Sequence, residues 1–368
     1  MYDPTRTPRS APIRGRGASS NPANRFLPIH VVPDPSDSLS EEDGSDPGGD
    51  RTVFMRDTTR SVISRNQSPD LHFGASFNPY RGCEHGCSYC YARPTHEYLG
   101  FSAGLDFESK ILVKDAAPAL LRSTFASPQW TPEPVMMSGV TDAYQPVERR
   151  LELTRRCLAV FAEARNPVAI VTKNHLVTRD IDILRELAEH DATAVVLSVT
   201  SLDRSLQRGL EPRASSPARR LDAVTALATA GVPVGVMVAP VIPGLTDTEI
   251  PAILAAAKDA GASFAQYVLL RLPHGVKDVF AEWLTERFPD RAGRVLSRIR
   301  STRQGRLNDS AFSVRGRGEG PYADQIRSLF AVSRRRQGLD APAPPLSTDA
   351  FIRPAVATPA NPQMDLFV

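Results

Sequence analysis

Three cysteines that lie close together are the residues of this chain whose types and spacing point most clearly to chemistry. Cys83, Cys87 and Cys90 stand in a C-x3-C-x2-C arrangement and are three of only four cysteines in 368 residues. Cysteines gathered in so short a stretch are typical of a metal site, not of a disulfide framework. A structural zinc site is closed by four ligands, and the usual [4Fe-4S] cluster takes one cysteine per iron. The spacing therefore predicts a metal centre with one coordination position that these thiolates leave unassigned.

Two kinds of metal centre fit this set of ligands. His85 could complete a four-ligand zinc site. The stretch NPYRGCEHGCSYCY instead resembles the radical SAM superfamily, in which C-x3-C-x2-C carries an aromatic residue before the last cysteine, here Tyr89. The resemblance implies that the cysteines hold a [4Fe-4S] cluster whose fourth iron binds S-adenosylmethionine (SAM). It also implies why a fourth cysteine is not wanted, since that ligand would occupy the iron that SAM must reach.

The elements that would position these residues are indicated by the apolar pattern between residues 73 and 273. Six apolar runs cover residues 73–80, 134–139, 168–173, 194–200, 232–240 and 263–273. Amphipathic segments separate them, and we expect helices within residues 116–125, 146–164, 178–190, 215–231, 246–261 and 276–288. Near-continuous apolar strands separated by helices imply parallel pairing with right-handed crossovers. The fold class is therefore α/β, and six units suit a doubly wound sheet or the partial (β/α)6 barrel that the resemblance implies.

Polar or glycine residues end nearly every one of these runs. In βα barrels the reactive groups lie on loops at the carboxyl ends of the strands. The residues at these ends that we single out are Ser138, Gly139, Thr141, Asp142, Lys173, Ser198, Thr200 and Arg271. Any βα protein places turn-forming residues at strand ends, so this convergence supports the barrel and does not by itself identify a site.

The resemblance assigns cofactor-binding roles to most of these residues and to Tyr89. It implies that Ser138-Gly139 with Thr141-Asp142 binds the SAM amino group, and Gly139 would let the backbone approach the cofactor. It further implies that Lys173 binds the SAM carboxylate and that Ser198 and Thr200 face the ribose hydroxyls. A solvated lysine at a helix entry and buried hydroxyls bonded to barrel backbone are the alternatives.

Three further polar or reactive residues have two interpretations each. Glu211 and Arg220 could be partners near the SAM carboxylate or charges that flank a helix, and we expect Glu211 to lie at the surface. Helical spacing places Cys157 near Val160 and Phe161, which predicts a small buried hydrophobic residue and not a ligand.

Length and composition suggest one large barrel with tails. Hydrophobic residues make up 41% of the chain, which is enough for a sizeable core. Residues 1–70 are rich in Pro, Ser, Asp, Gly and Arg without a sustained period, so we expect them to be mostly disordered. We expect the barrel to span residues 71–305, a helical extension to span 306–336, and a disordered proline-rich tail to span 337–368.

The charge and the termini restrict the partners and the compartment. The formal net charge is only +3, which does not by itself indicate a nucleic-acid binder. Only five of the 44 basic residues are lysine, and arginines gather within residues 14–17, 211–220, 291–306 and 333–336. Arginine is well suited to bind phosphate. A GC-rich genome, however, also encodes proteins with many arginines and few lysines. No apolar run reaches 18 residues and no leader is apparent, so we expect a cytoplasmic protein without membrane contact, in agreement with reduced thiolates.

Within the superfamily, the segments NPYRGCEHGCSYCYAR, SGVTDAYQPVE, VTKNHLVTRD and VAPVIPGLTD look like the DNA-repair-photolyase-like branch related to spore photoproduct lyase. The resemblance covers roughly residues 73–275 and implies reductive cleavage of SAM to a 5'-deoxyadenosyl radical. It also implies a low-potential electron donor, flavodoxin or ferredoxin, and DNA as a partner. Spore photoproduct lyase carries a hydrogen-donating cysteine near the second strand, where this chain has Gly139, and that departure argues against lyase activity itself.

The end of the chain carries a short motif of its own. QMDLF, with Gln363, Leu366 and Phe367, resembles the peptide by which bacterial DNA polymerases and repair proteins bind the sliding clamp. Gln would hydrogen-bond in the pocket of the clamp, and the two apolar residues would anchor the peptide. An amphipathic chain end is the alternative, because five-residue motifs arise by chance.

Three classes of function remain open from the sequence. The first is a radical SAM enzyme that acts on nucleic acid. The second is a radical SAM enzyme that modifies a protein or a small metabolite. The third is a zinc-stabilised or clamp-bound interaction module without enzymatic activity.

Overall fold

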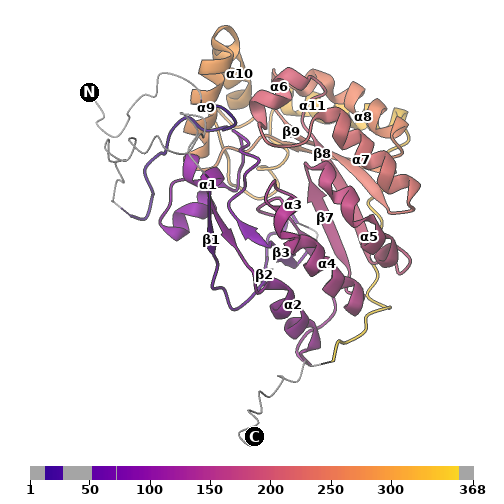
Figure 1. Cartoon of the computed structure of the whole chain (residues 1–368). Coiled ribbons are helices and arrows are strands. Elements are labelled where there is room, and N and C mark those ends of the chain that lie inside the picture. Colours follow the sequence, from indigo (N-terminus) through magenta and orange to yellow (C-terminus); the bar gives the residue numbers. More distant parts are fainter. Residues whose placement is uncertain (1–12, 28–51, 72, 356–368) are drawn as a thin grey trace, which may run out of the picture.

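Six parallel strands form the main sheet of the computed structural model, which describes residues 13–27, 52–71 and 73–355 (Figure 1). The strands are β3 (Ala75–Phe77), β6 (Val135–Met137), β7 (Val168–Thr172), β8 (Thr193–Val199), β9 (Val234–Val241) and β10 (Phe264–Leu269). They are neighbours in chain order, and a short strand β2 (Ile63–Arg65) pairs antiparallel with β3 at one edge. A doubly wound sheet reverses its strand order at a switch point. The sequential order therefore decides for the open barrel of radical SAM type.

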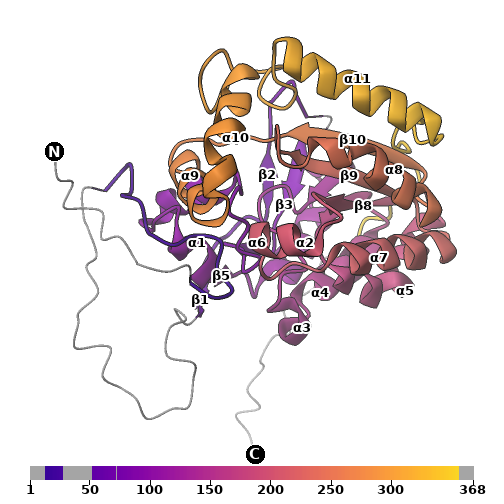
Figure 2. The ribbon, with the colours of Figure 1, turned by 90° about the horizontal axis from the view of Figure 1, so that it is seen from above.

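The helices that follow these strands match the segments that the apolar spacing predicts, except that α2 ends one residue later and a 3-10 turn begins three residues before the third segment. They are α2 (Ala117–Ala126), α3 (Glu148–Leu151), α4 (Leu153–Ala164), α5 (Ile181–Ala188), α7 (Pro217–Thr229), α8 (Ile250–Asp259) and α9 (Val276–Arg287), with 3-10 turns η3 (His175–Asp180) and η4 (Asp247–Glu249). Figure 2 shows α4, α5, α7 and α8 on the outer side of the curved sheet. An additional helix, α6 (Arg204–Leu210), begins where the Asp203 side chain accepts hydrogen bonds from the Ser205 and Leu206 amides.

The two faces of the sheet have different surroundings. In β7, Val168, Ile170 and Thr172 are buried, whereas Ala169 and Val171 are partly exposed. Because successive side chains of a strand point to opposite faces, the buried set packs on the helices and the other set faces the inside of the barrel. The inside is therefore the accessible face, and it leads to the carboxyl ends of the strands.

A second, three-stranded sheet supports the cysteine loop, and the sequence reasoning missed it. Its strands are β1 (Val53–Arg56), β5 (Lys110–Val113) and β4 (Tyr80–Arg81), in the order β1-β5-β4. The turn η2 (Arg93–Leu99) and helix α1 (Leu105–Ser109) lie between β4 and β5 in the chain. β4 ends two residues before Cys83, so this small sheet fixes the point where the cysteine loop begins.

The described residues of the expected N-terminal extension, 13–27 and 52–70, are packed on the rest of the structure. Residues 13–27, which we call the N-terminal strap, bury Ile13 and Ala18 against Leu105 and Val279. Residues 52–71 contain β1 and β2, each paired with a strand of one of the two sheets. The contacts are long-range, and the local composition gave no sign of them.

The described part of the tail also packs on the barrel, where disorder was expected. After α10 (Pro289–Ser301) and α11 (Pro321–Arg336), Leu339 is completely buried and its carbonyl accepts from the Ala265 amide of β10 at 3.1 Å. Further on, the Ile352 amide donates to the Ala164 carbonyl at 2.8 Å, just before β7. The tail thus runs to the amino ends of the strands. The predicted clamp motif at Gln363, Leu366 and Phe367 lies outside the described residues.

None of the helices in the described parts of the chain has the length and hydrophobicity that crossing a lipid bilayer requires. The expected limits of the barrel, the helical extension and the tail stay predictions.

Candidate active site

The cysteine loop follows β4 and carries three free thiols. Cys83 and Cys87 are buried, and Cys90 is partly exposed. Gly82 and Gly86 have φ values of +80° and +63°, which favour glycine at both turns of the loop. Burial raises the pKa of the Cys87 and Cys90 thiols, and the neighbouring cysteine thiols raise it further. Both thiols are therefore protonated in the metal-free chain, and metal binding must release their protons.

A buried ion pair stabilises the cysteine loop. Arg93 donates to the Cys87 carbonyl from Nε at 3.0 Å and to the Glu108 carboxylate from Nη2 at 2.9 Å. The same carboxylate accepts from the backbone amides of Gly17 and Ala18 in the N-terminal strap, at 3.0 and 2.9 Å. The strap, α1 and the cysteine loop therefore meet at one carboxylate.

The strap also changes the interpretation of its arginines. Residues 14–17 are one of the arginine clusters considered for phosphate contact. Arg16 is instead 6% exposed and donates to the Glu108 carbonyl at 2.6 Å and to the Thr52 hydroxyl at 3.0 Å. This arginine stabilises the packing of the strap.

His85, the residue that could complete a zinc site, has partners for both ring nitrogens. Its Nδ1 lies 3.4 Å from the Asp142 carboxylate, and its Nε2 lies 3.2 Å from Asn174 Nδ2. In the described parts of the chain, no three His, Cys, Asp or Glu side chains are arranged around the position of one metal ion. Cys83 is a further neighbour of His85, and together with Asp142 it raises the pKa of His85 above its usual range despite burial.

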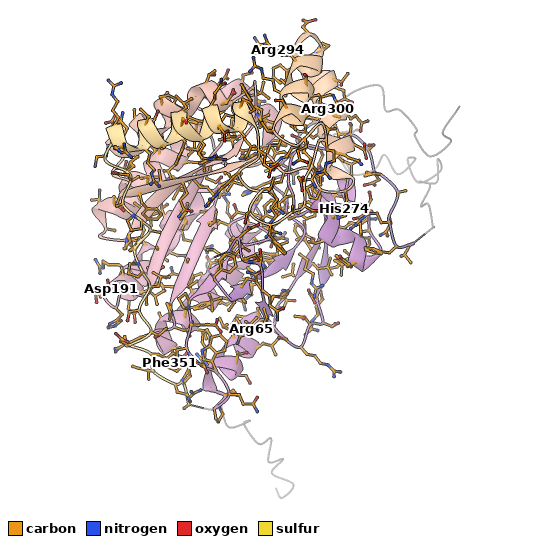
Figure 3. All side chains as sticks on the ribbon, turned by 180° about the vertical axis from the view of Figure 1, so that it is seen from behind. Arg65, Asp191, His274, Arg294, Arg300 and Phe351 are labelled. Carbon is orange, nitrogen blue, oxygen red and sulfur yellow. The ribbon has the colours of Figure 1, made fainter. Side chains whose placement is uncertain are left out.

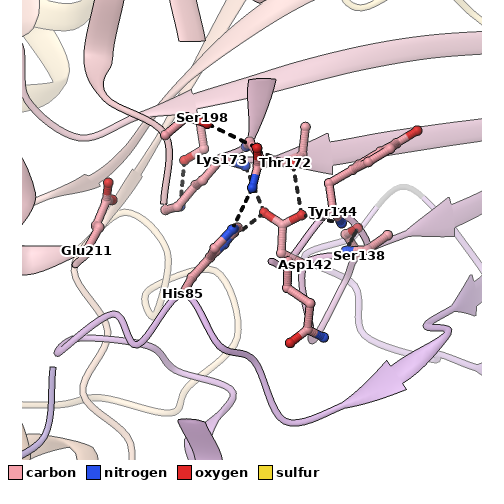
Figure 4. Close-up of polar contacts among 12 residues, drawn as sticks. His85, Ser138, Asp142, Tyr144, Thr172, Lys173, Ser198 and Glu211 are labelled. Atoms are coloured by element: carbon pink, nitrogen blue, oxygen red, sulfur yellow. Dashed lines mark hydrogen bonds and ion pairs between the residues drawn. The ribbon is translucent and has the colours of Figure 1, made fainter. Parts of the chain in front are cut away.

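Asp142 joins the ends of β6 and β7 to this histidine (Figure 4). Its carboxylate accepts from Thr172 Oγ1, the Lys173 amide and the Tyr144 amide at 2.8, 2.8 and 2.9 Å. Burial would raise the pKa of Asp142, but His85 and these amides outweigh it and lower the pKa to about 2. The carboxylate is therefore ionised, and protein donors occupy both of its oxygens.

The other residues predicted to bind the SAM amino group lie in the same turn after β6. Ser138 and Gly139 are partly exposed there, and Ser138 has a φ of +69° while its hydroxyl accepts from the Ala143 amide at 2.9 Å. Thr141 is buried and donates to the Tyr80 carbonyl at 2.9 Å. Of this predicted set, Ser138 and Gly139 present the most accessible atoms.

Lys173 and the two hydroxyls of β8 form a connected group at the next strand ends. Lys173 Nζ donates to Ser198 Oγ at 2.8 Å, and Ser198 Oγ donates to the Ala239 carbonyl at 2.9 Å. The Thr200 hydroxyl lies 2.8 Å from the same carbonyl and 2.6 Å from the Glu211 carboxylate. Both hydroxyls are buried, and both are hydrogen-bonded to the barrel backbone, which is the alternative considered from the sequence. Binding of the SAM ribose by Ser198 and Thr200 therefore stays a prediction.

The expectation that Glu211 lies at the surface is wrong. Glu211 is completely buried, forms an ion pair with Arg220, and accepts a hydrogen bond from the Tyr89 hydroxyl. Burial would raise the pKa of Glu211, but Arg220 and Lys173 outweigh it and lower the pKa to about 2. The polar segment EPRASSPARR gave no signal of burial, because its charged residues pair only in the fold.

Tyr89 thereby has a structural connection that the motif alone did not indicate. Its hydroxyl contacts Glu211 and lies 3.2 Å from Thr200 Oγ1, and the Lys173 ammonium lies 6.0 Å from its ring centroid. The aromatic residue before the last cysteine links the cysteine loop to the ends of β7 and β8. Cys157, by contrast, lies on the buried face of α4 in the main hydrophobic core, as predicted.

Tyr91 and Arg271 lie together at the carboxyl end of the barrel, and the sequence reasoning missed their pairing. Tyr91, directly after Cys90, is 46% exposed and its hydroxyl donates to the Gly139 carbonyl at 2.5 Å. The Arg271 guanidinium stacks over its ring at 5.0 Å from the centroid. The second aromatic in CSYCY was the available signal for Tyr91, and the position of Arg271 after the sixth strand was the signal for the arginine.

Comparisons with known proteins agree with this arrangement. The sequence model of the radical SAM superfamily matches residues 77–257. An uncharacterized protein of Mycobacterium tuberculosis is 33% identical over 338 residues, which cover 86% of this chain and 95% of that protein. An uncharacterized protein of Methanocaldococcus jannaschii is 31% identical over 172 residues, which cover 47% of this chain and 62% of that protein.

Solved structures with a similar fold include two of spore photoproduct lyase. A mutant of that enzyme has a TM-score of 0.54 and 17% identity, covering 78% of this chain and 80% of the other. The enzyme complexed with dinucleoside spore photoproduct has a TM-score of 0.52 and 18% identity, covering 77% and 78%. At this identity the likeness shows a shared fold.

Proposed function

Because the chain belongs to the radical SAM superfamily of enzymes, we propose that Cys83, Cys87 and Cys90 bind a [4Fe-4S] cluster and that the protein cleaves SAM reductively. The observation that carries the proposal is the set of three free thiols on the loop that follows β4, beside the carboxyl ends of an open parallel sheet. When bound, the cluster supplies the electron that converts SAM to methionine and a 5'-deoxyadenosyl radical, which abstracts hydrogen from substrate.

The residues of the chain would hold the cofactor and keep water away from it. Lys173 would bind the SAM carboxylate, and this role is supported by an ammonium that is bonded to a neutral hydroxyl and lies over the face of Tyr89. The turn at Ser138 and Gly139 offers partly exposed backbone for the SAM amino group. Tyr89, Thr141, Asp142, Ser198 and Thr200 would support that geometry, because their polar atoms already have protein partners.

For the substrate we propose nucleic acid, with DNA as the first choice. The shared fold with spore photoproduct lyase and the exposed arginines of α10 support this choice. Modification of a protein or small metabolite is the alternative within the same chemistry, and a zinc-stabilised or clamp-bound module is the alternative outside it. The glycine at position 139 argues against the hydrogen-donating cysteine of a lyase.

The proposal extends to partners and compartment. A low-potential flavodoxin or ferredoxin would reduce the cluster. We expect the enzyme in the cytoplasm, because thiolates reserved for a cluster need a reducing compartment. The terminal motif with Gln363, Leu366 and Phe367 is proposed to bind the sliding clamp, and a clamp pull-down with the terminal peptide, lost on Leu366→Ala with Phe367→Ala, tests that part.

Anaerobic reconstitution tests the central claim. Protein supplied with iron and sulfide should turn brown and, after reduction, should form 5'-deoxyadenosine from SAM. The triple variant Cys83→Ala, Cys87→Ala and Cys90→Ala should lose both properties, while Cys157→Ala keeps them. A colourless protein, or one that holds zinc in a four-ligand cage, would refute the proposed function. Stimulation of SAM cleavage by DNA, compared with RNA and cell extract, then separates nucleic acid from other substrates.

A further inference from the structure

Arg271 is a half-buried cation that has no acceptor among the described residues. It follows β10 at the carboxyl end of the barrel, and its guanidinium lies 5.0 Å from the ring centroid of Tyr91. Among the residues that the structure describes, it donates no hydrogen bond and forms no ion pair. Nearby Arg315 is different, because its Nε donates to the Asp70 carboxylate at 2.5 Å.

The stacking leaves the hydrogen-bonding capacity of Arg271 unused. A guanidinium stacked on a ring is covered on one face, whereas its five N–H donors lie in its plane. Burial lowers the pKa of Arg271, so its surroundings disfavour the charge in the absence of a counter-ion. A desolvated cation with free planar donors is suited to bind an oxyanion in bidentate fashion.

The platform beneath Arg271 is fixed relative to the candidate active site. Tyr91 follows Cys90 directly, and its hydroxyl is bonded to Gly139 in the turn after β6. An anion held by Arg271 would therefore lie beside both the cysteine loop and the turn proposed to bind SAM. This is the place where a substrate must approach the reacting centre.

The surroundings of Arg271 are also positive. Arg303 is buried behind it and donates to the carbonyls of Leu270, Val314 and Arg315, without a carboxylate partner in the described residues. Asp70, a carboxylate near Arg271, is already paired with Arg315. Arg303 and Arg315 are thus two further cations near Arg271, which favours an anionic ligand, and Asp309 and Glu319 offset part of the charge of Arg303.

Helix α10 adds an exposed arginine face on the same side. Arg291, Arg294 and Arg298 are exposed at helical spacing, while Val295 and Ile299 are buried in the apolar cluster that contains Cys87 and Tyr89. Figure 3 shows Arg294 and Arg300 at the end of the molecule away from Arg65 and Phe351. Several arginines in a row fit the repeated phosphates of a nucleic-acid strand better than a single carboxylate.

We propose that Arg271, held on the ring of Tyr91, binds a backbone phosphate of a nucleic-acid strand and so sets which part of the strand faces the cysteine loop. The inference rests on the proposed function for its reaction, and it adds the residue and the chemical group by which the substrate is recognised. Arg271 acts here as a residue that positions the substrate.

Binding of a fluorescein-labelled single-stranded oligonucleotide to the full chain, followed by anisotropy, tests the inference independently of SAM cleavage. Arg271→Met should weaken binding by about 10- to 100-fold, the usual value of a hydrogen bond to a charged group. It should also reduce the slope of log Kd against log salt by about 0.7. Arg271→Lys keeps the charge but not the planar fork, and it should restore only part of the affinity. Arg122→Met, an exposed arginine of α2 paired with Glu163, is the matched control and should bind like the wild type.

Each of the following outcomes would overturn one part of the proposal. Equal binding by wild type and Arg271→Met, with equal melting temperatures, would remove Arg271 from substrate recognition and leave the proposed enzyme intact. If Arg271→Met is unstable, Arg271→Lys decides in the same way. Equal binding of an oligonucleotide with uncharged methylphosphonate linkages would overturn phosphate as the ligand. No binding of the oligonucleotide, or displacement by an equal concentration of a mononucleotide or an acidic peptide, would overturn the nucleic-acid strand. Iron content and SAM cleavage, measured separately, report on the proposed function alone.

Discussion

The Arg93 guanidinium donates to the Glu108 carboxylate at 2.9 Å, and neither side chain is exposed to solvent. Arg93 also holds the Cys87 carbonyl, and Glu108 holds two amides of the N-terminal strap. The pair therefore connects the cysteine loop to a segment that lies some 70 residues earlier in the chain, before the barrel begins.

Removal of the charge of Glu108 should be strongly destabilising. Glu108→Gln leaves Arg93 buried without a counter-ion, and breaking a buried pair in this way costs about 3–5 kcal/mol. Denaturant unfolding of the variant should show that loss in the free energy of unfolding. Glu163→Gln, which breaks the exposed pair with Arg122, is the control and should cost less than about 1 kcal/mol. Equal losses in the two variants would mean that the buried pair is not what secures the loop.

Displacement of the strap should make the metal centre labile. A Cβ at Gly17 would lie 1.7 Å from the Gly86 carbonyl oxygen in the cysteine loop, so Gly17→Ala must push the strap away. We expect a severalfold faster loss of iron to a chelator from the reconstituted variant. Gly293→Ala on α10 meets no atom within 4 Å and should leave that rate unchanged. An unchanged rate for Gly17→Ala would show that the strap does not shield the centre.

Gly139 should be dispensable for folding but not for cofactor binding. Its φ lies outside the left-handed region, and an added Cβ would meet its nearest atoms, in Met136 and Ser76, only at 3.9 Å. Gly139→Ala should thus change the free energy of unfolding by less than about 0.5 kcal/mol. SAM affinity, measured by equilibrium dialysis with reconstituted protein, should fall about tenfold, because the side chain occupies space that the cofactor needs.

Gly235 provides the contrast for that substitution. A Cβ there would lie 2.3 Å from the buried ring of Phe264, so Gly235→Ala should cost about 1–3 kcal/mol. Undiminished SAM affinity in Gly139→Ala would remove the turn after β6 from the cofactor site.

Lys173 should matter for SAM more than for stability. Its ammonium is hydrogen-bonded to the Ser198 hydroxyl, and in the described residues it forms no direct ion pair, so Lys173→Met leaves no buried charge unpaired. We expect SAM affinity to fall by about 10- to 100-fold, the value of a hydrogen bond to a charged group. Lys258→Met on the outer face of α8 is the control. If the two variants bind SAM equally well, the lysine has only the solvated role that the sequence left open.

Cys157 should be separable from the three cysteines of the loop. Cys157 is completely buried in the core. The reconstituted Cys157→Ala protein should therefore contain as much iron as the wild type, and its free energy of unfolding should fall by about 1 kcal/mol. Cys157→Ser places a hydroxyl in the same apolar site and should cost about 1–3 kcal/mol. Iron analysis and thermal unfolding check both values. Loss of iron in Cys157→Ala would make this residue a ligand after all.

The helices and the six parallel strands could be predicted because each is encoded by a local pattern. Apolar runs such as residues 168–173 and 194–200 became β7 and β8 with ends shifted by one residue at most. The strap, β1 and the packed tail could not be predicted in this way. Their stability comes from contacts such as Gly17 to Glu108 and Ile352 to Ala164, which join residues far apart in the chain. Composition alone made these segments look disordered.

The sequence by itself predicted a metal centre and determined the fold family, because the spacing of Cys83, Cys87 and Cys90 and the alternation of strands and helices are local properties. Only the tertiary structure decided which charges are buried and which remain available. Glu211 looked like a surface residue, and Arg271 looked like any arginine at a strand end. In the fold the first is paired with Arg220, and the second is stacked on Tyr91 with no acceptor in the described parts of the chain. The cost of a desolvated charge depends on its neighbours in space, and the order of residues along the chain does not contain that information.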